Sequence, residues 1–158
     1  MSDSVIIREG ITAMAFTTVR EWLARSYWTP GIEREVIERA SRNSALVIGA
    51  FSEDGAQAGF MRVVSDKVRF AYLCDVIVAD EWRGRGVARR MVRHALDHPE
   101  LMTVRTWTLA TRDAHGVYEP LGFKPMSHPE SRAETWMVLR RGQSWADESA
   151  PPSGSSAP

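Results

Sequence analysis

The chain has 158 residues, of which 44% are hydrophobic and 25% charged, so it is long enough for one globular domain with a single core. Its 20 basic and 20 acidic residues cancel, which argues against a protein held to nucleic acid or to an anionic membrane by its overall charge. No apolar run reaches the roughly 18 residues that a membrane helix needs, and the N-terminus has no secretory pattern, so we expect a cytoplasmic protein.

The first predicted elements are a short strand and two helices. An apolar strand over residues 5–7 is followed by Thr12, whose hydroxyl would cap a helix that runs to about Arg25. A turn-rich segment comes next. Apolar residues at helical spacing then predict a second helix over residues 32–43.

The middle of the chain changes from helical spacing to strands. An antiparallel meander of strands is predicted over residues 45–51, 59–64 and 68–78. A helix over residues 84–97 follows, because its apolar residues fall on one stripe, and Pro99 lies just beyond its end.

The last elements alternate between strand and helix. Residues 101–111 have apolar groups on both faces, which predicts a strand in the middle of the sheet. A short helix over residues 113–120 and a strand at 135–139 come next. The chain then becomes rich in Pro, Ser, Gly and Ala, so we expect one domain over residues 1–142 and a disordered tail over residues 143–158. This order of elements predicts an α+β fold in which helices cover a mixed sheet.

The turn between the third strand of the meander and the following helix has the composition of an anion site. Gly84 and Gly86 remove side chains from the start of the helix, so an anion can approach the unpaired N–H groups at its positive end. Arg83 and Arg85 would add charge-assisted hydrogen bonds to a diphosphate. The alternative is a polar turn that only caps a surface helix.

Two other phosphate-binding motifs do not fit this turn. A Walker loop requires a Gly-Lys-Ser/Thr sequence, which the chain lacks. A dinucleotide fingerprint requires a small residue where Arg89 stands, and it opens a βαβ unit instead of following antiparallel strands.

The same turn has the sequence pattern Arg83-x-x-Gly86-x-Ala88. A second motif, DAHGVYEPLGF, runs from Asp113 to Phe123 and would form a short helix that carries a tyrosine. Both motifs, and the order of the elements, resemble the GNAT superfamily of N-acetyltransferases. The resemblance implies a mixed, mostly antiparallel sheet of about seven strands flanked by about four helices. It also implies direct transfer of an acetyl group from acetyl-CoA to a primary amine, without a metal.

The resemblance assigns several residues to the cofactor. The backbone N–H groups of the loop would hold the coenzyme A pyrophosphate, and this loop comprises Arg83, Gly84, Arg85, Gly86, Val87 and Ala88. The pantetheine arm would pair with the backbone of the preceding strand at Val76, Ile77 and Val78. Tyr118 would lie near the thioester and act as the general acid for the departing thiolate, or else serve only to anchor its small helix.

Attack on a thioester requires a neutral amine, so a base must remove a proton from an amine that is protonated at pH 7. Asp75 interrupts an apolar run, where a charge is costly unless it is used or paired. We therefore expect Asp75 to be either the base or a hydrogen-bonded structural carboxylate. His115 and water are the other candidates, and Glu81 is expected only to cap the turn.

The acceptor would be a small-molecule or peptide amine. The resemblance places the loop between the first two helices at the acceptor pocket, and this loop contains Tyr27 and Trp28. The two aromatic side chains would either form a wall over the substrate or pack the loop down.

Other residues predict no additional site. The single cysteine, Cys74, excludes an intrachain disulfide and is expected to be a small core residue instead of an acetyl carrier. His94 and His98 have no third ligand at a matching spacing, so no metal site is expected. The arginine stripe of the predicted 84–97 helix is expected to face solvent, not nucleic acid. Exposed strand edges would allow a homodimer. The alternative function is a non-catalytic acyl-CoA-binding sensor or subunit.

Overall fold

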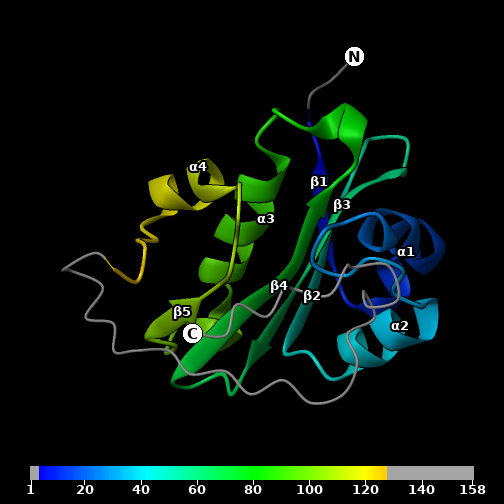
Figure 1. Cartoon of the computed structure of the whole chain (residues 1–158). Coiled ribbons are helices and arrows are strands. Elements are labelled where there is room, and N and C mark those ends of the chain that lie inside the picture. The colour runs from blue at the N-terminus through cyan, green and yellow to red at the C-terminus, as the bar shows by residue number, and fades with distance from the viewer. Residues whose placement is uncertain (1–3, 128–158) are drawn as a thin grey trace, which may run out of the picture.

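The computed structural model describes residues 4–127, and in this part of the chain five strands form one sheet (Figure 1). The strands are β1 (Ile6–Glu9), β2 (Leu46–Phe51), β3 (Gln57–Ser65), β4 (Phe70–Val78) and β5 (Thr106–Thr108). They lie side by side in chain order. Neighbouring strands from β1 to β4 are antiparallel, whereas β5 runs parallel to β4. The α+β fold with a mostly antiparallel sheet is therefore confirmed.

Helices cover both faces of this sheet. The described α-helices are α1 (Phe16–Ala24), α2 (Arg34–Arg42), α3 (Val87–Leu96) and α4 (His115–Tyr118). Short 3-10 turns are η1 (Ile11–Ala13), η2 (Asp80–Trp82), η3 (Pro99–Leu101) and η4 (Glu119–Leu121). Helices α1 and α2 lie on one face of the sheet and α3 and α4 on the other (Figure 1). Within residues 4–127, no helix has the length and apolar character needed to cross a bilayer.

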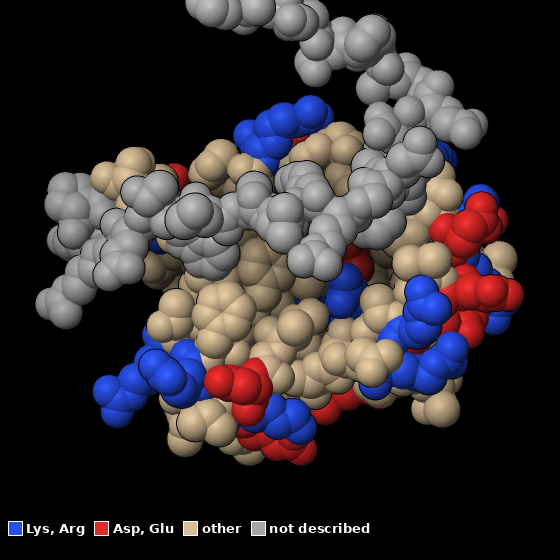
Figure 2. Space-filling model, turned by 60° about the horizontal axis from the view of Figure 1, so that its bottom comes forward, with Lys and Arg blue, Asp and Glu red and all other residues tan. Residues whose placement is uncertain are grey.

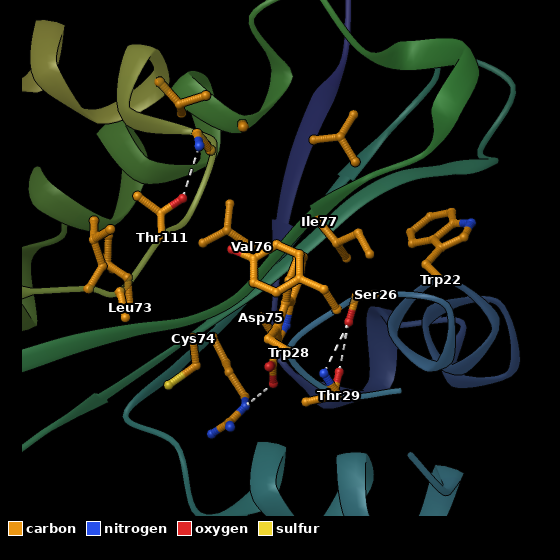
Figure 3. Close-up of a pocket in the computed structure, with 18 of the residues that line it drawn as sticks. Trp22, Ser26, Trp28, Thr29, Leu73, Cys74, Asp75, Val76, Ile77 and Thr111 are labelled. Atoms are coloured by element: carbon orange, nitrogen blue, oxygen red, sulfur yellow. Dashed lines mark hydrogen bonds and ion pairs between the residues drawn. The ribbon is translucent and has the colours of Figure 1, made fainter. Parts of the chain in front are cut away.

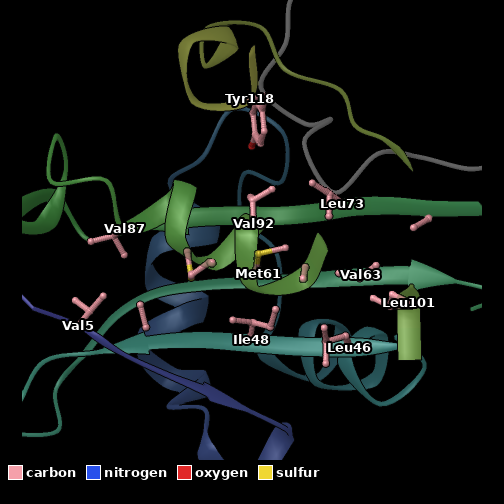
Figure 4. Close-up of a cluster of buried hydrophobic side chains, with 14 of the residues drawn as sticks. Val5, Leu46, Ile48, Met61, Val63, Leu73, Val87, Val92, Leu101 and Tyr118 are labelled. Carbon is pink, nitrogen blue, oxygen red and sulfur yellow. The ribbon is translucent and has the colours of Figure 1, made fainter. Parts of the chain in front are cut away.

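Strand β2 shows why the sheet has a hydrophobic layer on each face. All of its residues are buried. Because successive side chains of a strand point to opposite faces, Leu46 and Ile48 pack in the layer under α3, whereas Val47 and Phe51 pack with α1 and α2. Figure 4 shows the first layer, in which side chains of the strands meet Val92 and its neighbours on α3.

The sheet has fewer strands than the about seven predicted, because the described residues contain five. The strand predicted over residues 101–111 shortens to β5, which lies at an edge of the described sheet and not in its middle. Pro99 begins the turn η3, so the chain from Pro99 to Leu101 is not extended. The side chains of Leu101 and Val104 are buried even though these residues are not part of a strand. The strand predicted at 135–139 and the predicted tail lie outside the described residues.

The start of α1 also differs from the prediction. Thr12 lies in η1 and does not cap the helix, which begins later, at Phe16. The N–H group of Ala15 donates to the side-chain Oε1 of Gln57 at 2.7 Å. A residue of β3 therefore satisfies the helix start, and the local sequence does not reveal such a long-range cap.

Charged side chains of both signs are interspersed on the face of the molecule shown in Figure 2. Among the described residues, some charged side chains pair within one helix or turn, as Arg34 does with Glu38 at 2.6 Å and Arg83 with Asp80 at 2.9 Å. Exposed pairs of this kind contribute little to stability, so the fold rests mainly on the two hydrophobic layers.

Candidate active site

Strand β4 carries an extra residue in its middle. Phe60 of β3 lies opposite Ile77, but the next aligned pair is Arg62 with Cys74, so β4 uses one residue more than β3 over this stretch. The backbone at Asp75 accommodates the extra residue with a φ of 54°, in the left-handed region. Such a bulge bends its strand and increases the local twist.

Strands β4 and β5 separate near this bulge. β5 pairs only with residues 70–72, so no described strand covers the β5 side of β4 from Leu73 to Val78. A cleft of about 1880 Å³ opens along this edge. Its walls come from α2 and the loop before it, from the start of α3, and from residues 109–118. Figure 3 shows the floor at Asp75, Val76 and Ile77, with Thr111 on one side and Trp22, Ser26 and Thr29 on the other.

The loop between β4 and α3 ends in an open helix N-terminus. Gly84 and Gly86 have φ values of 73° and 76°, so the helix predicted over residues 84–97 begins only at Val87. A Cβ atom at either glycine would meet no atom within 4 Å, which shows that the space in front of the loop is open. Gly86 is the N-cap, and no side-chain hydrogen bond caps this end of α3. The first-turn N–H groups are therefore available to an anion.

The cleft brings together nearly all of the residues predicted to bind the cofactor. Those that line it are Val76, Ile77, Val78, Arg83, Gly84, Gly86, Val87, Ala88 and Tyr118. Arg85 does not line the cleft, and its guanidinium lies 5.2 Å from the centre of the Trp82 ring. The guanidinium of Arg83 pairs with Asp80 and donates from Nε to the carbonyl of Val78 at 3.3 Å.

Tyr118 is buried where α4 meets the sheet, and its side chain points from α4 toward β4 (Figure 4). Its ring packs edge-on against Phe123, with 5.9 Å between the ring centres. Burial, with smaller effects of Tyr27 and Asp113, raises the pKa of Tyr118 to about 12. The phenol therefore keeps its proton at neutral pH and can donate it, or a hydrogen bond, to an atom in the cleft.

Asp75 is bound by an arginine. Its Oδ2 accepts from Nε of Arg62 at 2.6 Å, and the two side chains are only 9% and 18% exposed. Nη1 of the same guanidinium lies 3.4 Å from the hydroxyl oxygen of Ser44. This buried ion pair favours the structural alternative for Asp75 over the role of base. Arg62 was not predicted as a partner of Asp75, because only the pairing of β3 with β4 brings the two residues together.

The other polar residues considered near the site lie outside the cleft. His115 starts α4 and Glu81 lies in η2, and both side chains are exposed and absent from the lining. The carboxylates that line the cleft are those of Asp75, Asp80 and Asp113, and Asp80 pairs with Arg83 at 2.9 Å.

The loop between α1 and α2 contacts the segment that precedes α4. Oη of Tyr27 accepts a hydrogen bond from the N–H of Arg112 at 3.0 Å, and the guanidinium of Arg112 lies 3.9 Å from the centre of the Tyr27 ring. Trp28 packs edge-on against Tyr27, with ring centres 4.9 Å apart. Because all three residues line the cleft, this contact joins its two walls. Arg112 was not predicted as a site residue, because it lies far from Tyr27 in the chain.

Cys74 also lines the cleft and is partly buried. Burial raises the pKa of its thiol to about 11. The thiol is therefore almost entirely protonated at neutral pH, which makes it a weak nucleophile.

The two histidines of α3 and the turn after it meet a carboxylate from β1. His94 Nε2 lies 2.5 Å and His98 Nε2 3.4 Å from the carboxylate oxygens of Glu9. The hydrogen bond with His94 lowers the pKa of Glu9. Across residues 4–127, no group of three His, Cys, Asp or Glu side chains has an arrangement that could hold a metal ion.

Comparison with known proteins agrees with the resemblance found in the sequence. The model of the acetyltransferase (GNAT) family matches residues 14–123. A crystal structure of a GNAT-family protein from Xanthomonas campestris pv. campestris is 35% identical to this chain and has a TM-score of 0.73. The match covers 85% of this chain and 94% of that one.

More distant structures share the same fold. A proposed acetyltransferase from Deinococcus radiodurans R1 is 22% identical, with a TM-score of 0.69 and coverage of 89% of this chain and 92% of that one. A GNAT-family N-acetyltransferase from Escherichia coli, solved in complex with CoA, is 20% identical, with a TM-score of 0.60 and coverage of 76% and 68%. A search of curated proteins found no match. The family model and the Xanthomonas structure each span most of the chain, which therefore belongs to the GNAT family of acetyltransferases.

Proposed function

We propose that the protein is an N-acetyltransferase that moves an acetyl group from acetyl-CoA directly to a primary amine. The observation that carries this proposal is a single cleft that joins an open strand edge, an uncapped helix start and a buried tyrosine. Family membership supports the acetyl donor, and the Escherichia coli relative was solved with CoA.

The described residues fit acetyl-CoA at its polar groups. The pyrophosphate would lie in front of α3, where the N–H groups of Val87 and Ala88 have no side-chain cap. A negative charge at such a helix end is stabilised by about 0.3–2 kcal/mol. The open edge of β4 at residues 76–78 would pair with the amide groups of the pantetheine arm, in the manner of an added strand. Acetyl-CoA supplies an acetyl group that is activated as a thioester.

The reaction requires two proton transfers, one to the leaving sulfur and one from the acceptor amine. Tyr118 would hold a proton at Oη and donate it, or a hydrogen bond, to the leaving sulfur; its pKa, raised to about 12, keeps the phenol protonated and favours the hydrogen bond over full proton transfer. The acceptor amine would lose its proton to water in the open cleft. Asp75 would hold Arg62 in place, since its carboxylate is already bound by that guanidinium.

The second candidate function is a sensor or subunit that binds acyl-CoA without turnover. Such a protein would need the loop and the strand edge but not Tyr118 in the cleft. The cleft also extends well beyond the β4 edge, to α2 and the loop before it. This additional space favours an enzyme with a second substrate.

The test is calorimetric titration of the purified protein with acetyl-CoA, followed by an assay of free thiol release over a panel of amines. We expect micromolar binding and thiol release with one class of amine. Binding without release on any amine would favour the sensor, whereas the absence of binding would refute the assignment of the loop.

A further inference from the structure

The part of the cleft that belongs to α1, α2 and the neighbouring strands carries an excess of positive charge. We call this part the acceptor half and define it by the lining residues within 22–43 and 62–75. It contains the guanidinium groups of Arg25, Arg39 and Arg62 and one carboxylate, that of Asp75. A molecule bound in this half therefore meets a net positive field.

The one carboxylate is already neutralised. Asp75 is bound by Arg62 at 2.6 Å, so it offers no additional charge to a cationic ligand. Ser44 holds the same guanidinium, and its hydroxyl in turn donates to the carbonyl of Ala40 at 2.8 Å. Arg62 consequently lies at the C-terminal end of α2, with its planar fork fixed from two sides.

Arg39 lies at the same end of α2 and has no charge partner among the described residues. The side-chain amide of Asn43 donates to the carbonyl of Arg39 at 2.8 Å. By contrast, Arg34 and Arg42 of this helix both pair with Glu38, at 2.6 Å and 3.7 Å. Residues three and four apart share a helix face, and the cleft is lined by Val36, Arg39, Ala40 and Asn43. Arg39 is thus the arginine of α2 that lines the cleft, and it has no carboxylate partner among the described residues.

We propose that the acceptor amine of this enzyme also carries an oxyanion, a carboxylate or a phosphate ester, that binds to Arg39 beside the Arg62–Asp75 ion pair. The inference rests on the proposed function, because it names the class of amine for the same cleft. A guanidinium matches both oxyanions through paired N–H donors. The same field disfavours diamines and polyamines, because the acceptor half has no spare carboxylate for a second ammonium group.

Matched pairs of amines test the charge requirement. One arm compares α-amino acids with their carboxamides, and the other compares amino alcohols and amino sugars with and without a phosphate ester. We expect kcat/KM for the preferred anionic member to exceed that of its uncharged partner by about 10- to 100-fold, as one charge-assisted contact would give. The arm that shows the difference identifies the oxyanion. A diamine should be the poorest substrate.

Variants of α2 assign this preference to one side chain. Arg39→Gln should remove most of the preference, leave the uncharged amine unaffected and leave the Kd of acetyl-CoA unchanged. Arg39→Lys should restore part of it. Arg42→Gln is the matched control, since Arg42 lies on the same helix, pairs with Glu38 and does not line the cleft. Calorimetric binding of the anionic amine to protein saturated with CoA gives a second readout that needs no turnover.

The outcomes separate the two proposals. If amines are acetylated but charged and uncharged members react equally, and Arg39→Gln changes neither, the anionic acceptor is refuted while the acetyltransferase stands. If no amine is acetylated, the proposed function fails, and the anionic-ligand site is then tested by the calorimetric binding of the anionic amine alone. Binding of an anionic amine that is weakened at least about tenfold by Arg39→Gln but not by Arg42→Gln supports it, and no such binding overturns it.

Discussion

Tyr118 and Cys74 line the same cleft, and burial has the same effect on both side chains. Loss of water around the charged form raises the pKa to about 12 for the phenol and to about 11 for the thiol. Both groups are therefore neutral near pH 7. A neutral phenol is suited to donate a proton or a hydrogen bond, whereas a neutral thiol is a poor acetyl carrier.

The change Tyr118→Phe removes the hydroxyl but keeps the ring and its contact with Phe123. We expect kcat to fall by about 10²- to 10⁴-fold, which is the usual contribution of a general acid. The Kd of acetyl-CoA should change little, and calorimetry measures it. Because the wild-type pKa is about 12, this tyrosine should cause no loss of rate between about pH 7 and pH 10. An unchanged kcat in the variant would leave Tyr118 a packing role only.

Cys74 should react slowly in the folded protein. A rise of the thiol pKa from 9.0 to about 11 lowers the thiolate fraction about 100-fold at a given pH. We expect iodoacetamide to label the folded protein more slowly than the urea-unfolded protein by about this factor. Mass spectrometry measures the two rates. Cys74→Ala should keep its activity, and loss of activity would instead support an acetyl-cysteine route.

The same pKa shift predicts how stability depends on pH. The unfolded thiol ionises near pH 9 and the folded thiol only near pH 11, so in this window the folded state binds more protons. The contribution of Cys74 is therefore fully present below pH 9 and is lost as the pH rises to about 11. Relative to Cys74→Ala, the wild-type protein should lose stability across this window, which urea denaturation measures.

At the scale of elements, the loop from β4 to α3 depends on backbone conformation more than on packing. Gly86 has a φ of 76°, and a Cβ atom there would meet nothing within 4 Å. The glycine is therefore required by the left-handed backbone, and the open space in front of it is available for a ligand.

Gly86→Ala should separate these two requirements. We expect a loss of about 1 kcal/mol in unfolding free energy from the left-handed backbone. Gly55→Ala is the control, because Gly55 also has a positive φ, of 91°, and open space around it, but lies in the turn between β2 and β3. Both variants should lose similar stability, but only Gly86→Ala should weaken the binding of acetyl-CoA. Equal affinities in the two variants would contradict the assignment of the loop.

The bulge in β4 brings a charged residue into the cleft floor. Asp75→Asn should keep the bulge, since asparagine tolerates the left-handed conformation, but it leaves Arg62 without a counter-charge. We expect a loss of about 2–4 kcal/mol in unfolding free energy, somewhat less than for a fully buried pair. Urea denaturation measures this loss. Glu38→Gln, which removes the partner of exposed arginines, should cost less than about 1 kcal/mol.

The pH dependence of the rate then decides the role of Asp75. If it only positions Arg62, the pH–rate profile of Asp75→Asn should run parallel to that of the wild type. A rate that no longer rises with pH would identify Asp75 as the base.

At the scale of the whole molecule, the cleft exists because β4 and β5 separate and two distant segments of the chain meet across the gap. β4 pairs with β3 along most of its length but with β5 only at residues 70–72. The loop between α1 and α2 then meets the segment before α4 through Tyr27 and Arg112. Residues from the first quarter of the chain and from the region before α4 thus form opposite walls of one site.

Local patterns were sufficient for much of this architecture. Strands β2, β3 and β4 and helices α2 and α3 were predicted close to their observed places, because their apolar spacing reflects burial on one or two faces. Helix α1 was found but its start was wrong, since Gln57 of another strand satisfies the N–H of Ala15. Residues 101–111 were predicted as one strand because apolar residues occur on both faces at strand spacing, although η3 buries Leu101 in a turn.

The sequence by itself determined the family, the glycine loop from Arg83 to Ala88 and the position of Tyr118, because each depends on residues that are close together in the chain. Only the tertiary structure decided that Asp75 is held by Arg62, that Arg85 turns away from the cleft, and that Tyr27 meets Arg112. The pairing of strands and the packing of loops set these contacts between distant residues. Pairs of charged residues that are distant in the chain leave no periodic signal in the sequence. The apolar pattern of a strand shows which face is buried, but it does not show which residue of the neighbouring strand lies opposite.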